Sequence, residues 1–335
     1  MTKNKATRPD KDGKKTTIGG QALIEGIMMR GVSTAAMAVR KKDGSIQVDE
    51  WELPDKKWYN KAPFVRGCFN FVQTLKEGMQ CMNKSIEISG YGDDEEPTKF
   101  DVWITNLLGE KNAEKFAEAL GALLSFVLVV VMLAVFLFVP SWLFTLIEKA
   151  AGETDVSMWK AAFEGVLKLL LFVAYMALVA QMKTMKTTYE YHGAEHKTIA
   201  CYEAGKPLTV ENIKPMIRFH PRCGTSFIII TLLVSIIVYS VVPINPAEWW
   251  GVENNALAAL LRVLIKLPLL PVIVGVAYEL IKLAGRYVNP FTRVISAPGL
   301  WMQRLTTREP NDKQIEIAIA AVTPCLPKEG EDDNW

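Results

Sequence analysis

The sequence predicts a mainly α-helical membrane protein with four transmembrane helices, a small N-terminal α+β region and a helical tail. Three observations predict this class. The middle of the 335-residue chain contains four apolar runs, each long enough to cross a hydrocarbon layer as a helix. The first 116 residues are basic and polar and contain strand-like and amphipathic segments. The chain from residue 284 onward is polar again and carries helix signals.

The composition argues against several other classes of protein. The net charge is only +2, so the total charge gives no reason to expect a sequence-specific nucleic-acid partner. The five cysteines are few, odd in number and without regular spacing, which argues against a disulfide scaffold. No apolar run follows the basic N-terminus, so we expect no cleavable signal peptide.

The N-terminal region is predicted at residues 18–98, after a disordered basic tail at 1–17. It begins with IGGQALIEGIMMRG at 18–31, which carries four glycines and is too broken for a helix. Two interpretations stay open. The stretch is either a set of turns that feed a strand, or a loop whose backbone approaches a ligand or another segment closely.

A β-hairpin is predicted next. Residues 35–41 and 45–51 are strand-like, and they flank the pair Asp43-Gly44. An Asp-Gly pair between two such runs is a strong hairpin signal, because glycine adopts the positive φ that tight turns require.

An amphipathic helix is predicted from Pro63 to about Ser89, because proline suits the first turn of a helix and apolar residues recur at helical spacing. Either it lies on anionic lipid as an interfacial helix, or it packs on the hairpin or the membrane helices. An acidic linker follows at 90–98. The apolar stripe contains Phe64, Phe71, Val72, Leu75, Met79, Met82 and Ile86.

The transmembrane domain is predicted at residues 99–283. An amphipathic approach helix at 100–118 leads into it. Each run that follows has the length and apolar composition of a membrane span. The four spans are expected at 120–146, 161–182, 226–242 and 256–283.

The fourth span contains two prolines and an acid. Pro268 and Pro271 predict a kink whose freed carbonyls turn towards protein or water. Glu279 lies well inside the span, and acids at such positions are functional candidates by default. The alternative is a salt bridge to Lys282 or Arg286 at the membrane edge.

Basic residues determine the predicted orientation. Lysine and arginine are concentrated in 1–116, in 183–225 and in the tail from 284, whereas the loop at 243–255 has none. An even number of spans places both termini on the same side. We therefore expect both termini and the segment 183–225 to be cytoplasmic.

The tail at 284–335 is predicted to be helical and to pack on the cytosolic face. Ala297-Pro298-Gly299 should break it, leaving a short amphipathic piece at 300–305. The sequence Pro-Asn-Asp at 310–312 is a helix-start signal, and it predicts a helix near 314–322.

The segment 183–225 gathers all three histidines of the chain. HGAEH at 192–196 has the form H-x-x-E-H. On a helix, positions four apart lie on one face, so His192 and His196 can reach one ion while Glu195 acts as a general base. This order of residues is the inverted zincin signature, and it predicts a Zn²⁺ site.

His220 and Cys223 offer the third and fourth ligands. Together with His192 and His196 they would complete a tetrahedral set, which favours a structural site because a catalytic one keeps a position open. If Cys223 is a neighbour rather than a ligand, three histidines and a water form a hydrolytic arrangement. Without a metal, the histidines would hydrogen-bond within a polar cap between the second and third spans.

Four motifs carry a resemblance to a known family. They are GGQALIEGIMMRG (19–31), YHGAEHKTIACYEAG (191–205), HPRCGTSF (220–227) and QRLTTREP (303–310). With them the chain resembles the YqhQ-like family of bacterial multi-pass membrane proteins, which is labelled a predicted metal-dependent enzyme. The resemblance implies a bacterial cell membrane as the location. It also implies that the first and last motifs lie against the histidine segment.

Two functions remain open. The first is a peptidase-like hydrolase in which His192, His196 and His220 hold Zn²⁺ and Glu195 activates water, with a peptide, a membrane protein or a lipid-linked group as substrate. The second is a non-catalytic scaffold or membrane-protein biogenesis factor. Its histidine segment would staple together a cytosolic platform that engages a ribosome or a translocon. Membrane lipid is a partner in both.

Overall fold

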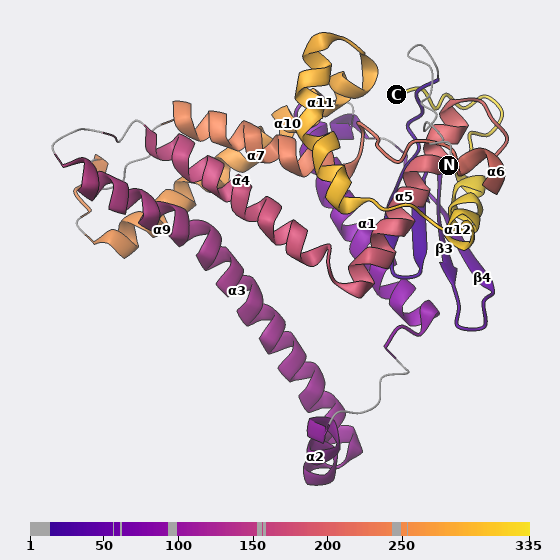
Figure 1. The fold of residues 1–335 in the computed structure, drawn as a ribbon, viewed down its shortest axis with the longest axis horizontal. Coiled ribbons are helices and arrows are strands. Elements are labelled where there is room, and N and C mark those ends of the chain that lie inside the picture. Colours follow the sequence, from indigo (N-terminus) through magenta and orange to yellow (C-terminus); the bar gives the residue numbers. More distant parts are fainter. Residues whose placement is uncertain are drawn as a thin grey trace, which may run out of the picture. The chain divides into compact units, whose positions relative to one another are not determined.

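The structure, a computed structural model, confirms the predicted class. The described part of the chain is mainly helical, with a sheet of four antiparallel strands near the N-terminus (Figure 1). It forms two compact units, the first from Met1–Tyr91 with Phe172–Trp335 and the second from Gly92–Leu171. The described residues are 14–55, 57–60, 62–92, 99–152, 156, 159–242, 249–252 and 254–335.

The four strands pair in sequence order. The predicted hairpin is confirmed as β3 and β4, and its turn contains Gly44 at a φ of 85°. The glycine-rich stretch, predicted as turns or a loop, forms a second hairpin from β1 and β2. The strands are β1 (Gly19–Leu23), β2 (Gly26–Arg30), β3 (Thr34–Arg40) and β4 (Ile46–Glu52).

Each face of the sheet is covered by helices. Side chains of β2 alternate between the faces, so Ile27 packs with α5 and α12, whereas Met28 packs with Cys81 of α1. Asn311 and Gln314 form a capping box at the start of α12, which confirms the predicted helix start. The helices are α1 (Val65–Ser89), α5 (Lys183–Glu203) and α12 (Asp312–Val322).

The same unit contains two apolar helices that pack on each other, α7 (Gly224–Val241) and α10 (Leu270–Arg286). Ile230 of α7 shares a core with Ile273 of α10. The predicted kink is present, because a 3-10 turn at Leu267–Leu269 separates α10 from the helix before it. That helix is α9 (Asn255–Lys266) and the turn is η3.

Glu279 of α10 has a different partner from those expected. Its carboxylate accepts hydrogen bonds from the Arg66 Nε–H at 2.8 Å and from the Phe64 backbone N–H at 3.1 Å. The expected alternative placed its salt bridge on Lys282 or Arg286, on the same helix. The tertiary contact with α1 supplies the hydrogen-bonding arginine, and Lys282 adds an electrostatic attraction.

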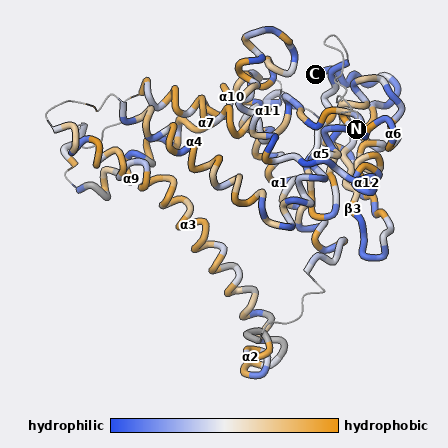
Figure 2. Tube along the Cα trace, in the orientation of Figure 1, coloured by the Kyte–Doolittle hydropathy of each residue, from blue (hydrophilic) through white to orange (hydrophobic). Residues whose placement is uncertain are grey.

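In the described part of the chain, four helices are long and apolar enough to cross a membrane, and Figure 2 shows runs of hydrophobic residues along helices such as α3 and α4. They correspond to the four spans that the sequence predicts. The third lies in α7 and the fourth runs through α9 and α10. The helices are Lys115–Ala151, Lys160–Val179, Gly224–Val241 and Leu260–Arg286.

The second unit contains α2 (Lys99–Leu108), α3 (Glu110–Ala151) and the first part of α4 (Lys160–Val179). The approach helix predicted at 100–118 is divided, because Gly109 adopts a φ of 77° between α2 and α3. Glycine accepts this conformation without a Cβ penalty. The second part of the approach helix is therefore continuous with the first span.

The first helix of the tail is longer than the sequence predicts. The predicted break at residues 297–299 is wrong, because α11 (Pro290–Thr306) continues through Pro298. The absence of a side chain at Gly299 lets α11 lie directly on α7, where a Cβ would come within 2.5 Å of Ser226. This packing stabilises a helix that its own sequence would interrupt.

Four short elements complete the described fold. One 3-10 turn precedes α1, a one-turn helix follows α5, and a 3-10 turn follows α12. They are η1 (Trp58–Asn60), α6 (Val210–Ile213) and η4 (Thr323–Cys325). The fourth is the isolated bridge of Thr16 with Asn334, so part of the segment predicted as a disordered tail makes defined contacts.

Candidate metal centre

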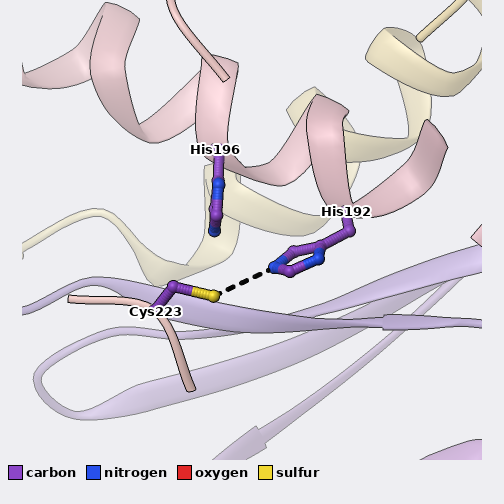
Figure 3. A group of neighbouring side chains, drawn as sticks. All are labelled: His192, His196 and Cys223. Atoms are coloured by element: carbon purple, nitrogen blue, oxygen red, sulfur yellow. Dashed lines mark hydrogen bonds between the residues drawn. The ribbon is translucent and has the colours of Figure 1, made fainter. Parts of the chain in front are cut away.

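Helix α5 places His192 and His196 on one face, four residues apart, with their ring centroids 4.4 Å apart. Cys223 precedes the first turn of α7 and points at the same space (Figure 3). One ligand atom from each of these residues lies within 4.8 Å of the others. Among the described residues, this is the group suited to hold a metal ion.

Backbone carbonyls fix the orientation of both imidazoles. The Nδ1 of His192 lies 2.7 Å from the Thr306 oxygen, and the Nδ1 of His196 lies 2.6 Å from the Arg218 oxygen. A carbonyl only accepts, so each Nδ1 carries the proton. Each Nε2 is then the nitrogen that faces the Cys223 sulfur and is available to a metal. Metal-binding histidines are commonly held in this way, with the second nitrogen bonded to a carbonyl or carboxylate.

The spacing of the group fits zinc. The Nε2 of His192 lies 3.2 Å from the Sγ of Cys223. Typical Zn–N and Zn–S bond lengths put tetrahedral nitrogen and sulfur ligands about 3.5 Å apart. Imidazole and thiolate ligands both suit Zn²⁺. A shift of a few tenths of an ångström would therefore let the two side chains share one ion.

Without a metal, the Cys223 thiolate and the His192 imidazolium each stabilise the charged form of the other. Burial raises the pKa of the Cys223 thiol, but His192 and His196 outweigh this and bring it well below its ordinary value. Burial lowers the pKa of His192, but the Cys223 thiolate reverses this and raises it to about 9. The centre thus holds its sulfur as the thiolate, which is the form that binds metals.

Glu195 lies on the same helix but is not one of the three converging groups. It is 4% exposed. The backbone of Gly20 in β1 hydrogen-bonds to its carboxylate, and its Oε2 has no partner among the described residues. Burial raises the pKa of Glu195, while His192 and His196 oppose the rise. A buried carboxylate with one unpaired oxygen is equipped to take up a proton.

His220 lies next to the group rather than within it. Its ring centroid is 5.6 Å from that of His196. Its Nε2 accepts a hydrogen bond from Arg222 at 3.0 Å and lies 3.7 Å from a carboxylate oxygen of Glu203. Burial and the charge of Arg222 lower the pKa of His220 to about 4. The structure thus brings three of the four predicted ligands together, and a ligand role for His220 stays a prediction.

The tail motif at 303–310 encloses the centre from the side of α11. Besides the Thr306 carbonyl, the Arg308 N–H donates to the Tyr189 oxygen at 2.8 Å. Gln303 binds both backbone groups of His220, at 2.8 and 2.6 Å. The expectation that this motif lies against the histidine segment is confirmed.

The glycine-rich motif meets the centre from the sheet. Besides the Gly20 contact, the Tyr191 hydroxyl of α5 donates to Glu25 at 2.9 Å. The carbonyl partners Thr306 and Arg218 are residues that sequence reasoning missed. Every residue has a backbone carbonyl, so the sequence cannot show which carbonyl contacts a histidine. The only hint was that Thr306 lies in the motif 303–310.

Comparison with known proteins gives a family but no activity. A family described as "Protein of unknown function (DUF1385)" matches residues 62–328. The chain is 34% identical over 319 residues to "Uncharacterized protein YqhQ" of Bacillus subtilis (strain 168), with 92% of each chain covered. No solved structure is significantly similar.

Proposed function

We propose that this chain, which belongs to the DUF1385 family, is a zinc-dependent, peptidase-like hydrolase in the bacterial cell membrane. One observation carries the proposal. Two imidazoles, each held at Nδ1 by a backbone carbonyl, turn their Nε2 atoms towards the Cys223 sulfur. Three protein ligands with one position left for water or substrate is the arrangement of catalytic zinc sites.

When bound, zinc polarises a substrate carbonyl and makes water a nucleophile near neutral pH. The protein's own residues do the remaining work. Glu195 takes the proton of the attacking water, since its Oε2 is unpaired, and returns it to the leaving group. Its other interaction, with the backbone of Gly20, fixes the direction of the carboxylate. The carbonyls of Thr306 and Arg218 keep the imidazoles in the tautomer that leaves Nε2 free.

The position of the centre indicates its substrates. Cys223 directly precedes α7, and Arg222 packs at Gly285 near the end of α10. The centre therefore lies where two apolar helices end. The excess of lysine and arginine on this side predicts that it is cytosolic. A membrane protein or peptide, or a lipid-linked group, would meet the centre at that interface.

Metal analysis of the purified full-length protein tests the ligand set. We expect about one zinc per chain in the wild type, and loss of zinc in separate variants His192→Ala, His196→Ala and Cys223→Ala. His220→Ala serves as the matched control and should keep its zinc. Loss of zinc in that variant would make His220 a fourth ligand and the site structural. A wild-type protein without metal would overturn the proposal.

The variant Glu195→Gln tests catalysis separately from metal binding. It removes the base but keeps the size of the side chain, so zinc should stay bound while turnover is lost. Quantitative sequencing of protein N-termini in cells that carry either form should show cleavage products that need Glu195. Identical sets of N-termini with zinc retained would refute the peptidase activity.

A second function is favoured by the burial of the centre. His196 and Cys223 are buried, and the group joins α5, the start of α7 and, through Thr306, the end of α11. Zinc would then hold these segments together as a rigid cytosolic surface that binds a ribosome or a translocon. In that case removal of zinc lowers the melting temperature, Glu195→Gln changes nothing, and the protein co-purifies with a large complex in high salt.

A further inference from the structure

Helix α1 buries its small residues and exposes many of its large apolar ones, although Phe71, Met82 and Ile88 are half-buried. Its buried positions are Gly67, Gly78, Cys81, Ser85 and Ser89. By contrast, Val72 is 64% exposed, Leu75 is 54% and Met79 is 68%. A helix of a soluble domain turns its apolar stripe to the core, and these three exposed residues of α1 depart from that arrangement.

The inner face of α1 cannot accept the apolar stripe, because its neighbours approach too closely. A Cβ at Gly67 would lie 2.7 Å from the Cβ of Tyr278 in α10, and a Cβ at Gly78 would lie 2.1 Å from Gln21 in β1. Small residues allow this direct contact between the helix and its neighbours. The exposed stripe is therefore a second face with a separate purpose.

The first turns of α1 contact the membrane-spanning helix α10 several turns before the C-terminal end of α10. The Cys68 thiol donates to the Pro271 oxygen at 3.2 Å, and Gly67 packs at Gly275. Lys282 is the first cation met from Gly275 towards the end of α10. At the helical rise, Gly275 is about 10 Å and Pro271 about 16 Å inside the level of Lys282. These contacts put the first turn of α1 at, or somewhat deeper than, the depth of about 5–10 Å at which interfacial helices lie.

Aromatic side chains add to this placement. Trp58 of η1, which leads into α1, is exposed. The ring of Tyr59 stacks on Phe69, a further exposed member of the stripe, with 4.4 Å between centroids. Tryptophan and tyrosine are enriched where headgroups meet acyl chains.

From these contacts we infer that α1 is an interfacial helix of the cytosolic leaflet and that its stripe lies in phospholipid. The stripe consists of Phe69, Val72, Leu75, Met79 and Ile86. Both interpretations of the sequence then hold, since one face packs on the sheet and α10 while another meets lipid. The sheet lies between this lipid-bound helix and α5, and the inference does not depend on zinc.

Site-directed spin labelling of the full-length protein in lipid nanodiscs tests the inference. Single cysteines replace Val72 and Met79 on the stripe, with matched positions Gln80 and Lys84 on the polar face as controls. The background carries Cys68→Ser, and the same background without an added cysteine measures labelling of the other, buried thiols. Collision rates with oxygen, which partitions into lipid, are compared with those of a water-soluble nickel complex.

The expected ratio of oxygen to nickel collisions is at least about tenfold higher at residues 72 and 79 than at 80 and 84, because the hydrocarbon layer excludes the polar nickel complex. Nanodiscs contain lipid, the scaffold belt at the rim of the disc and this protein, so no cellular protein partner is present to shield the stripe. Equal nickel access at all four positions would overturn the inference and would assign the stripe to a protein partner. Unchanged melting temperatures of the labelled variants exclude misfolding as the cause of either result.

Discussion

Gly193→Ala should damage the metal centre without touching a ligand. Gly193 lies in α5, one residue after His192, and a Cβ there would lie 1.9 Å from the Arg308 carbonyl oxygen. Contacts below 3.0 Å do not occur at real Cβ atoms, so the segment after α11 must move away. That segment supplies the Arg308–Tyr189 backbone bond and the Thr306 carbonyl that holds His192.

The cost has three parts. Overpacking costs about 1–3 kcal/mol, and loss of a hydrogen bond adds about 1 kcal/mol. The higher helix propensity of alanine returns about 1 kcal/mol. Because the clash is with rigid backbone, we expect a net loss near the upper end, about 2–3 kcal/mol. Loss of the Thr306 contact should weaken zinc binding by about 10- to 100-fold, as for other partners of metal-binding histidines.

Two measurements on the detergent-purified protein check this: the melting temperature, and the zinc dissociation constant from competition with a chelator. Gly224→Ala is the matched control, because Gly224 directly follows Cys223 and a Cβ there would meet nothing within 4 Å. The control should bind zinc like the wild type. If Gly193→Ala matches Gly224→Ala in both measurements, the proposed orientation of His192 by the tail is wrong.

Three further outcomes are expected. Gln303→Ala should cost about 2–4 kcal/mol, because it leaves buried backbone groups of His220 unpaired, and chemical unfolding measures the loss. Arg66→Met should lower the melting temperature, and Glu279→Gln added to it should restore part of the loss, because an unpaired carboxylate in a span is costly. Burial raises the pKa of Asp333, but hydrogen bonds from a lysine and two hydroxyls hold it below its ordinary value. Its stabilisation is therefore present above the ordinary value and lost as pH falls through the lower one. The melting temperature of Asp333→Asn should be below that of the wild type at pH 7, and the difference should shrink as pH falls below the ordinary pKa of an aspartate.

Local sequence patterns predicted the structure correctly wherever residues that are adjacent in the chain determine it. The Asp43-Gly44 turn, the cap at Asn311 and the apolar spans each depend on a few adjacent side chains and on their own backbone. The H-x-x-E-H spacing put two imidazoles on one helical face for the same reason. Five consecutive residues, 192–196, therefore predicted two of the three converging groups.

Predictions failed or stayed open where distant contacts decide. Pro298 should end a helix, but packing of Gly299 on α7 keeps α11 intact. Glu279 is paired with Arg66, which lies far from it in the sequence. No local pattern distinguishes these outcomes, because each depends on which surfaces meet after folding.

The candidate metal centre shows the same division. By itself, the sequence determined the types of candidate ligand, their helical spacing and their place between two apolar runs, because these follow from side-chain chemistry and from the period of a helix. Only the tertiary structure decided which groups converge. It brought Cys223 to the two imidazoles, turned His220 to Arg222, and placed the Thr306 and Arg218 carbonyls at the Nδ1 atoms. A carbonyl oxygen is the same at every residue, so its role comes from position alone.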